Sequence, residues 1–363
     1  MNFPRTSSPG RAPSDAIVLF DGKDLSPQLP IQFLKPMHLR RFQHSGTADV
    51  HRRKSDDPQQ RLTFAGAILQ KTFWSAALVV ALGTGIGTAA ELIEPDNLVF
   101  ERGIEYSNPD GQHLQLNLAR PKNESGDLPA VLCIHGGGFR AGNRDGNNAL
   151  CLKLAARGFV AVTASYRLAP KYQFPAAVYD VKAAVRWLRA NAAKYQINPT
   201  RIGVTGDSAG GHLAQFLGVT AEVKGFEGQG GYADQSSSVA CVVNRYGPSD
   251  FTKSYAKSVD AAEVLPLFLG GDLQTALPRH IQSSALNWVT PHAAPTLLLH
   301  GTEDKYVAYE QAVWMRDRLQ ACGVEVELLT LQGAGHGFKG ADAEKADQAL
   351  MAFFEKHLKP GKN

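Results

Sequence analysis

The stretch Arg201-Ile-Gly-Val-Thr-Gly206-Asp207-Ser208-Ala209-Gly210-Gly211-His212 carries the strongest signal of fold in this chain. A short apolar run typical of a strand ends in the pattern G-x-S-x-G, and a run typical of a helix follows it. Small residues two positions to either side of Ser208 allow a turn so tight that the serine hydroxyl is exposed at the start of the helix. The pattern therefore predicts a nucleophilic serine on a strand-turn-helix unit.

A glycine run lies about 70 residues upstream of this serine. The apolar run 130–134 leads into His135-Gly-Gly-Gly-Phe139. Glycines let backbone N–H groups approach a ligand closely, so the run is either a flexible turn at a strand end or the donor loop of an oxyanion hole. In the second interpretation, which the order along the chain favours, the N–H of Ala209 completes the donor set.

A nucleophilic serine needs a histidine base and an acid that orients it, each on a loop after a later strand. Asp304 follows the apolar run 295–300, and His336 follows the run 326–331, in the order Ser, Asp, His. Taken singly, Asp304 could be a solvated loop acid and His336 a turn histidine. Glu303, which adjoins Asp304, and Asp250, which also follows a strand-like run, are alternatives for the role of the acid.

From residue 91 onward, strand-like runs alternate with helical stretches, which is typical of a mostly parallel sheet covered on both faces. Pro175 opens a helix with apolar residues at helical spacing, which predicts a face turned to the core. We therefore expect an α/β fold with an eight-stranded sheet and helices on both faces. The predicted strands lie near 98–106, 112–119, 130–135, 159–164, 202–206, 240–245, 296–300 and 325–331.

Cofactor motifs are missing from the sequence. The chain has no HExxH, no EF-hand loop and no G-x-x-x-x-G-K-[ST], and its four cysteines form no CxxC pair. We therefore expect no metal or nucleotide cofactor, and we interpret the cysteines as buried thiols.

Charge is distributed unevenly along the 363 residues, whose formal net charge is +4. Residues 1–90 hold 11 Lys and Arg against 6 Asp and Glu, whereas the remainder holds 27 against 28. Binding to nucleic acid requires clustered positive charge, so the part after residue 90 is not expected to bind it.

The first 90 residues divide into two stretches. Residues 1–62 are rich in Pro, Ser, Arg and Gln without a hydrophobic period, so they are expected to be disordered, or not translated if the start lies near Leu62. Residues 63–90 contain Lys71, an apolar run 73–82 and small residues up to Ala90, which is the order of a secretory signal peptide. An uncleaved membrane anchor and an ordinary buried helix are the alternatives.

This pattern predicts an exported protein, periplasmic or secreted, that contacts the membrane only if residues 71–90 stay uncleaved. N-terminal sequencing of the cellular protein tests both the translation start and the cleavage. The catalytic domain is expected to span residues 91–363.

Several motifs between residues 98 and 358 resemble the hormone-sensitive-lipase-like α/β hydrolases. Among them, the sequence is most similar to the subfamily named for bifunctional xylan deacetylase and feruloyl esterase. The motifs are His135-Gly-Gly-Gly-Phe139, Tyr166-Arg-Leu-Ala-Pro170, Phe174-Pro-Ala176, Gly206-Asp-Ser-Ala-Gly-Gly211, Ala183-Ala-Val-Arg-Trp-Leu-Arg-Ala-Asn191, Gly247-Pro-Ser-Asp250, Leu299-His-Gly-Thr-Glu-Asp304 and Gly335-His-Gly-Phe338.

The resemblance implies a serine carboxylic ester hydrolase that acts through an acyl-enzyme intermediate. It assigns the nucleophile, base and orienting acid to Ser208, His336 and Asp304, and the oxyanion donors to Gly137, Gly138 and Ala209. Short-chain acyl esters are the implied substrates, among them acetylated or feruloylated polysaccharides.

Two features refine the resemblance. The acid motif lacks the Asp-Pro-Leu form of hormone-sensitive lipases, which favours the polysaccharide-esterase branch. Residues 222–238 and 247–292 are expected to line the acyl and alcohol sides of the site, because loops at the carboxyl ends of strands build the sites of such sheets. A serine peptidase or lipase on the same fold and a catalytically silent binding protein remain the alternatives.

Overall fold

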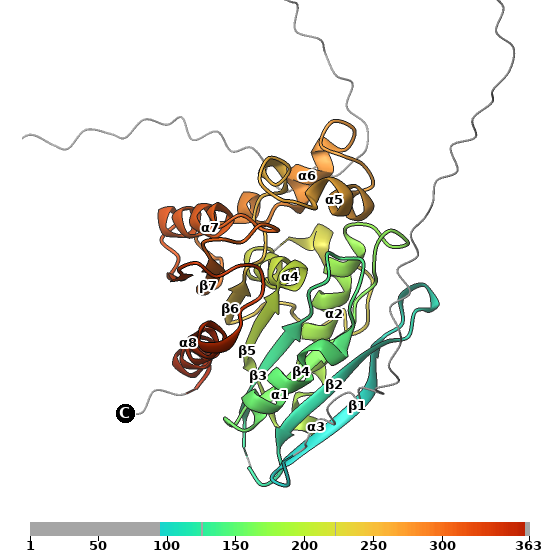
Figure 1. The fold of residues 1–363 in the computed structure, drawn as a ribbon. Helices are drawn as coiled ribbons and strands as arrows, with labels where there is room; N and C mark the ends of the chain where they lie inside the picture. Colours follow the sequence, from blue (N-terminus) through green and yellow to red (C-terminus); the bar gives the residue numbers. More distant parts are fainter. Residues whose placement is uncertain (1–94, 125, 222, 360–363) are drawn as a thin grey trace, which may run out of the picture. The chain divides into compact units, whose positions relative to one another are not determined.

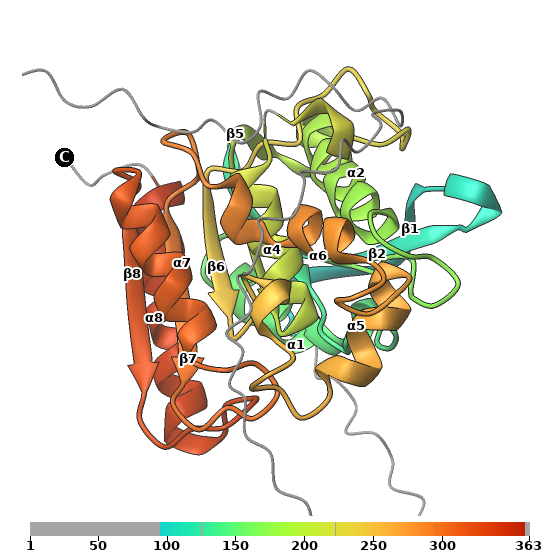
Figure 2. The same ribbon diagram turned by 90° about the horizontal axis from the view of Figure 1, so that it is seen from above.

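A single eight-stranded sheet organises the part of the chain that the computed structural model describes, residues 95–124, 126–221 and 223–359. The strand order is β1-β2-β4-β3-β5-β6-β7-β8, with β1 and β8 at opposite edges (Figure 1, Figure 2). The predicted α/β fold class is confirmed. The predictions for residues 1–62 and 63–90 lie outside the described residues.

The strands form where the sequence predicts them, with bounds that differ by a few residues. β1 pairs with β2 and β2 with β4 in antiparallel fashion, and the other neighbours are parallel. Central strands such as β3 and β4 are buried along their whole length, which explains their continuous apolar runs. The strands are β1 Leu98–Ser107, β2 Leu114–Pro121, β3 Leu128–Ile134, β4 Val160–Ala164, β5 Ile197–Asp207, β6 Cys241–Arg245, β7 Thr296–Gly301 and β8 Val326–Leu331.

Helices cover the two faces of the sheet with separate apolar cores. Alternate residues of β3 belong to different cores. Leu132 lies in the core that includes residues of the helices α2 (Ala176–Ala190), α4 (Ala209–Val219) and α7 (Glu310–Ala321). Val131 lies in the core that includes residues of α1 (Asn148–Ala155) and α8 (Gly340–Leu358). This follows from the two-residue period of a strand. The helix predicted after Pro175 is α2, and its apolar stripe is buried as expected.

The long connection between β6 and β7 contributes two further helices, α5 (Ala261–Leu269) and α6 (Leu277–Ser283). Figure 1 shows both beyond one end of the sheet, and Figure 2 shows them beside α4 from above. The short α3 (Ala192–Tyr195) lies between α2 and β5 along the chain. The carboxyl ends of parallel strands meet at one edge, so the loops after β3, β5, β6, β7 and β8 lie close together.

All four cysteines are free thiols. Cys133, Cys151 and Cys241 are buried as expected, but Cys322 is half-buried because it follows the end of α7. Burial and the neighbouring Cys133 thiol raise the pKa of Cys151.

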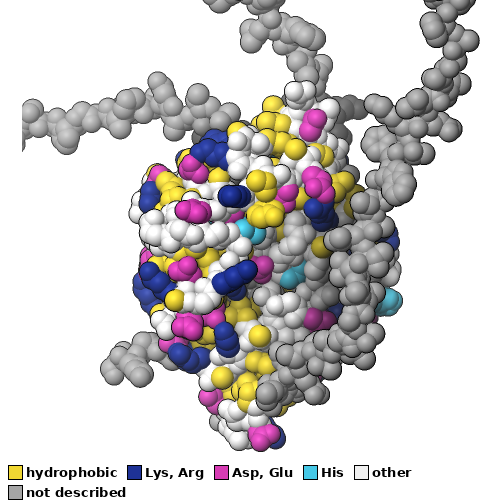
Figure 3. All heavy atoms as spheres, in the orientation of Figure 1, with side chains coloured by type: hydrophobic (Ala, Val, Ile, Leu, Met, Phe, Trp, Pro, Cys, Tyr) yellow, Lys and Arg dark blue, Asp and Glu magenta, His cyan; other side chains and the backbone are white. Residues whose placement is uncertain are grey.

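The surface carries charges of both signs. Figure 3 shows Lys and Arg side chains interspersed with Asp and Glu over the visible face. Among the described residues, no helix combines the length and the apolar composition needed to cross a bilayer.

Candidate active site

Ser208 lies on a sharp turn between β5 and α4. Its backbone has φ 52° and ψ −118°, values that a residue with a side chain rarely adopts and that store local strain. A Cβ atom at Gly206 would lie 2.2 Å from the carbonyl oxygen of Gly210, and one at Gly210 would lie 2.1 Å from that of Ile134. The two glycines are therefore required by the close approach of backbone at this turn, as the motif predicts.

Ser208, His336 and Asp304 come together in one chain of hydrogen bonds. The Ser208 Oγ lies 2.9 Å from His336 Nε2, and His336 Nδ1 lies 2.7 Å from Asp304 Oδ2. The three side chains follow β5, β8 and β7, strands whose carboxyl ends share one edge of the sheet. A serine that can pass its proton to a histidine is the arrangement needed for nucleophilic attack.

The side chain of Asp304 is fully buried and well supplied with donors. Its Oδ1 accepts hydrogen bonds from the N–H groups of Tyr306 and Val307, both 2.9 Å away, and His300 Nε2 lies 3.5 Å from Oδ2. Burial alone would raise the pKa of this carboxyl, but hydrogen bonds from His300, His336 and the Val307 N–H hold it well below its usual range. The carboxylate is therefore ionised at neutral pH and keeps the imidazole proton on Nδ1, so Nε2 is free to accept from Ser208.

The two competing acids do not reach His336. Glu303 is exposed on the same turn as Asp304. The Asp250 carboxylate instead accepts hydrogen bonds from Thr252 and forms an ion pair with Lys253. Geometry thus favours Asp304 among the three.

The remaining buried histidines bind backbone carbonyls, as expected for structural residues. His135 Nδ1 donates to Gly136 O, and His212 Nδ1 donates to Pro248 O. Burial lowers the pKa of His135, and it lowers that of His212 to about 4. Both rings are therefore neutral at physiological pH.

The glycine run after β3 lies against Ser208. Gly137 and Gly138 have φ 111° and 58°, which favour glycine, and a Cβ at Gly137 would lie 2.3 Å from Ala141 O. Ala209 is the first residue of α4, so its N–H has no partner within the helix. All three line the same cavity as Ser208, where their N–H groups can serve a developing oxyanion.

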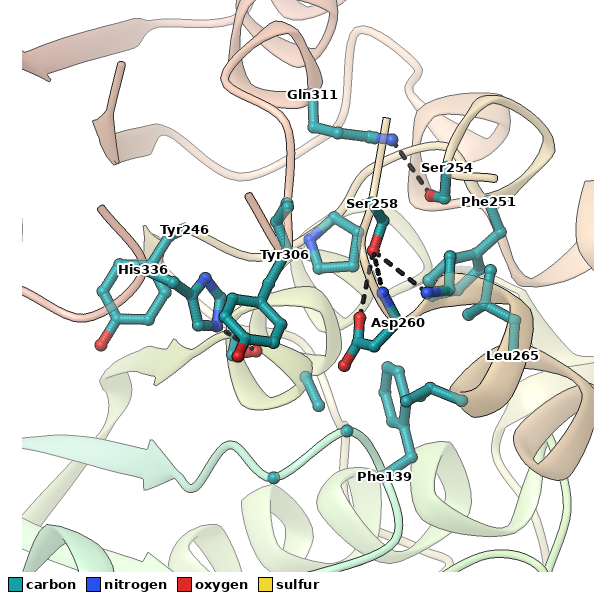
Figure 4. A pocket seen from close by; sticks show the side chains of 18 of the residues that line it. Phe139, Tyr246, Phe251, Ser254, Ser258, Asp260, Leu265, Tyr306, Gln311 and His336 are labelled. Atoms are coloured by element: carbon teal, nitrogen blue, oxygen red, sulfur yellow. Dashed lines mark hydrogen bonds between the residues drawn. The ribbon is translucent and has the colours of Figure 1, made fainter. Parts of the chain in front are cut away.

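A cavity of about 520 Å³ opens beside Ser208. Figure 4 shows two tyrosines, Tyr246 and Tyr306, beside His336, and the apolar side chains Phe251 and Leu265 farther along the cavity, with Ser254 and Gln311 near Phe251. The aromatic end holds Tyr246 and Tyr306 beside His336, with ring centroids 4.9 and 5.2 Å from the imidazole. The apolar end is lined by Phe139, Phe251, Val264 and Leu265.

The cavity confirms one expectation about its walls and contradicts the other. The stretch 247–292 contributes lining residues from Pro248 to Leu265. The stretch 222–238 was expected to line the cavity, but none of its described residues does. Its Glu227 instead bridges two buried cations of α2, Lys182 Nζ at 2.8 Å and Arg186 Nη1 at 2.9 Å.

The prediction for 247–292 covered Ser258 and Asp260 without singling them out, and Tyr306 was not predicted to line the cavity. Tyr306 stands two positions after Asp304, so an aromatic residue inside the acid loop was the available signal. Ser258 and Asp260 precede α5 in a stretch whose contact with the site depends on tertiary structure. No group of three or more His, Cys, Asp or Glu side chains within residues 95–124, 126–221 and 223–359 is placed to hold a metal ion.

Comparison with known proteins supports an esterase relationship. A family model described as BD-FAE matches residues 116–319. The chain is 32% identical over 264 residues to Esterase LipC of Mycobacterium tuberculosis, a match that covers 70% of this chain and 64% of LipC. This chain therefore matches less than two thirds of the length of LipC.

Two further proteins match over larger shares of their own length. Ethyl acetate hydrolase of Pseudomonas putida is 31% identical over 292 residues, which cover 74% of this chain and 84% of that enzyme. The solved structure of a truncated carbohydrate esterase from gut microbiota has a TM-score of 0.65 and 28% identity, and the match covers 72% of this chain and 97% of that one. The resemblance drawn from the sequence motifs is confirmed.

Proposed function

Because the chain belongs to the BD-FAE family, within the α/β hydrolases, we propose that it hydrolyses carboxylic esters through an acyl-enzyme intermediate. Ser208 is the nucleophile, and His336 is the general base and acid. Asp304 orients the imidazole of His336 and stabilises its protonated form. The observation that carries the proposal is the hydrogen-bond chain of these residues, with Ser208 on a strained turn at the wall of a cavity.

The first half of the reaction forms the acyl-enzyme. Ser208 Oγ attacks the ester carbonyl carbon while its proton passes to His336 Nε2. The carbonyl oxygen becomes an oxyanion that accepts hydrogen bonds from the N–H groups of Gly137, Gly138 and Ala209. His336 then gives the proton to the alcohol oxygen, the C–O bond breaks and the alcohol leaves.

The second half regenerates the serine. Water donates a proton to His336 and attacks the acyl carbon, and the same amides hold the second oxyanion. The proton returns to Ser208 Oγ as the carboxylic acid leaves. Asp304 stays ionised throughout, because its hydrogen bonds keep its pKa low.

Short acyl esters of polysaccharides, acetylated or feruloylated, are the substrates we propose. Support comes from the BD-FAE family match and from the likeness to a structure described as a carbohydrate esterase. The part of the cavity lined by Val264 and Leu265 of α5 suits an apolar acyl group.

The test compares the full chain with Ser208→Ala in hydrolysis of p-nitrophenyl acetate and in labelling by a fluorophosphonate probe. We expect hydrolysis to fall about 10⁶-fold and labelling to disappear, because loss of the nucleophile removes the acyl-enzyme route. Ser236→Ala is the matched control, since Ser236 is exposed and outside the cavity.

Each other outcome identifies an alternative. Undiminished hydrolysis by Ser208→Ala contradicts Ser208 as the nucleophile. A folded protein that the probe labels but that cleaves peptides rather than esters is a peptidase. A folded protein without labelling or hydrolysis is a binding protein.

A further inference from the structure

The proton transfer in the proposed reaction fixes which end of the cavity takes the alcohol. The leaving oxygen must receive its proton from His336 Nε2, so it lies beside that atom when the C–O bond breaks. The alcohol then extends along the end of the cavity that holds His336. The acyl group points to the opposite end, where Phe251, Val264 and Leu265 form an apolar wall.

Tyr306 offers a surface to whatever occupies the alcohol end. Tyr306 is 49% exposed, so its ring is open to contact with a ligand in the cavity. The ring lines the cavity with its centroid 5.2 Å from that of His336 and a tilt of 43°. Figure 4 shows Tyr306 next to His336, with Phe139 and Leu265 farther along the cavity.

Hydrogen-bonding groups stand beside this tyrosine. The N–H of Val259 donates to Lys305 O at 2.9 Å, which joins the segment 258–260 to the residue before Tyr306. Ser258 and Asp260 both line the cavity, and the Ser258 hydroxyl donates to Asp260 Oδ1 at 3.0 Å. The oxygens of a carboxyl group accept hydrogen bonds, so Asp260 suits an alcohol that carries hydroxyl groups.

We propose that Tyr306 and Asp260 form an alcohol-side subsite that selects esters whose alcohol carries a ring with free hydroxyl groups. The ring lies against Tyr306, and its hydroxyls donate to Asp260. This inference rests on the proposed function, since it uses the proton transfer from His336 to locate the leaving alcohol.

The test uses three acetate esters with different alcohols: ethyl acetate, benzyl acetate and methyl 6-O-acetyl-glucopyranoside. All three esters give the same acetyl-enzyme, so they share the deacylation step. Differences in kcat/KM among them therefore arise in acylation and report contacts with the alcohol. Tyr306→Ala is expected to lower kcat/KM about three- to tenfold for both ring esters and less than twofold for ethyl acetate. Tyr306→Phe keeps the ring and should restore the values.

A second variant distinguishes recognition of a sugar ring from recognition of a plain aromatic ring. Asp260→Ala is expected to lower kcat/KM about 10- to 100-fold for the sugar ester and to leave benzyl acetate within twofold, because only the sugar loses a hydrogen bond to a charged group. Tyr232→Ala is the control, since Tyr232 is 42% exposed but outside the cavity.

Three results would overturn the subsite. Equal losses on all three alcohols after Tyr306→Ala would mean that the tyrosine only supports His336 and Asp304. If ethyl butyrate is added as a fourth substrate and Tyr306→Ala lowers kcat/KM for it more than for ethyl acetate, the acyl group lies at this end. An unchanged sugar ester in Asp260→Ala would remove the carboxylate from recognition.

Failure of the proposed function gives a different result. In that case the wild-type chain hydrolyses none of the three acetates, or Ser208→Ala hydrolyses them as well as the wild-type chain does. Hydrolysis of all three that depends on Ser208, without the alcohol-dependent pattern, overturns the subsite alone.

Discussion

Replacing Asp304 with Asn changes one oxygen of a buried carboxylate into an NH₂ group, and the surrounding donors determine where that group points. Two backbone N–H groups, those of Tyr306 and Val307, donate to Oδ1. The amide oxygen of Asn is therefore expected to take the Oδ1 position. The NH₂ group then occupies the Oδ2 position, 2.7 Å from His336 Nδ1.

This orientation selects the wrong imidazole tautomer. Nδ1 must accept from the Asn amide, so the proton moves to Nε2, which can no longer accept from Ser208. The negative charge that stabilises the imidazolium is lost as well. We expect kcat/KM for p-nitrophenyl acetate to fall about 10⁴-fold, equivalent to about 5 kcal/mol of transition-state stabilisation.

The assay measures kcat/KM at pH 7 for wild type, Asp304→Asn and the matched control Glu303→Gln. Glu303 is exposed on the same turn, so its variant makes the same change of charge and should retain at least a third of the activity. Thermal unfolding of each variant verifies that it is folded. The reasoning is refuted if Asp304→Asn keeps more than a tenth of wild-type activity or if Glu303→Gln loses a thousandfold.

Two predictions concern stability. Glu227→Gln leaves the buried cations Lys182 and Arg186 without a carboxylate and should lower the free energy of unfolding by about 3 kcal/mol in urea titrations, whereas the exposed control Asp234→Asn should change it by under about 0.5 kcal/mol. Burial lowers the pKa of His212 to about 4, against 6.5 for the free side chain. As the pH falls from 6.5 to 4, the unfolded chain therefore binds a proton that the folded protein excludes, and the free energy of unfolding decreases by about 3 kcal/mol. In urea titrations across this range, the decrease should be about 3 kcal/mol smaller in His212→Asn than in wild type. Parallel curves for the two proteins would contradict this prediction.

Local sequence was sufficient to predict the strands and three side chains that the structure brings together, those of Ser208, His336 and Asp304. Strands buried on both faces require continuous apolar runs, and β3 shows one. The turn at Ser208 brings backbone atoms so close that Gly206 and Gly210 admit no side chain. Asp304 and His336 could be predicted to lie near Ser208 because each follows a strand whose carboxyl end reaches the same end of the sheet.

The walls of the site depend on contacts between distant segments, which the sequence pattern does not encode. Glycines in 222–238 indicated a loop at the site, but a Cβ at Gly228 would lie 2.6 Å from Tyr179 on α2. They allow close packing against that helix instead. Asp260 lies beside Tyr306 because a backbone hydrogen bond joins Val259 to Lys305, residues that are separated along the chain by the helices α5 and α6 and the strand β7.

In the turn from Asp304 to Val307, the backbone supports the Asp304 carboxylate while the side chain of Tyr306 faces the cavity. Tyr306 orients the acid through its backbone N–H, a group that every residue except proline possesses. The side chain at this position can therefore drift while the acid keeps its donor. With the alcohol-side subsite that we propose, single substitutions at this position would change the alcohols accepted while the support of Asp304 stays in place.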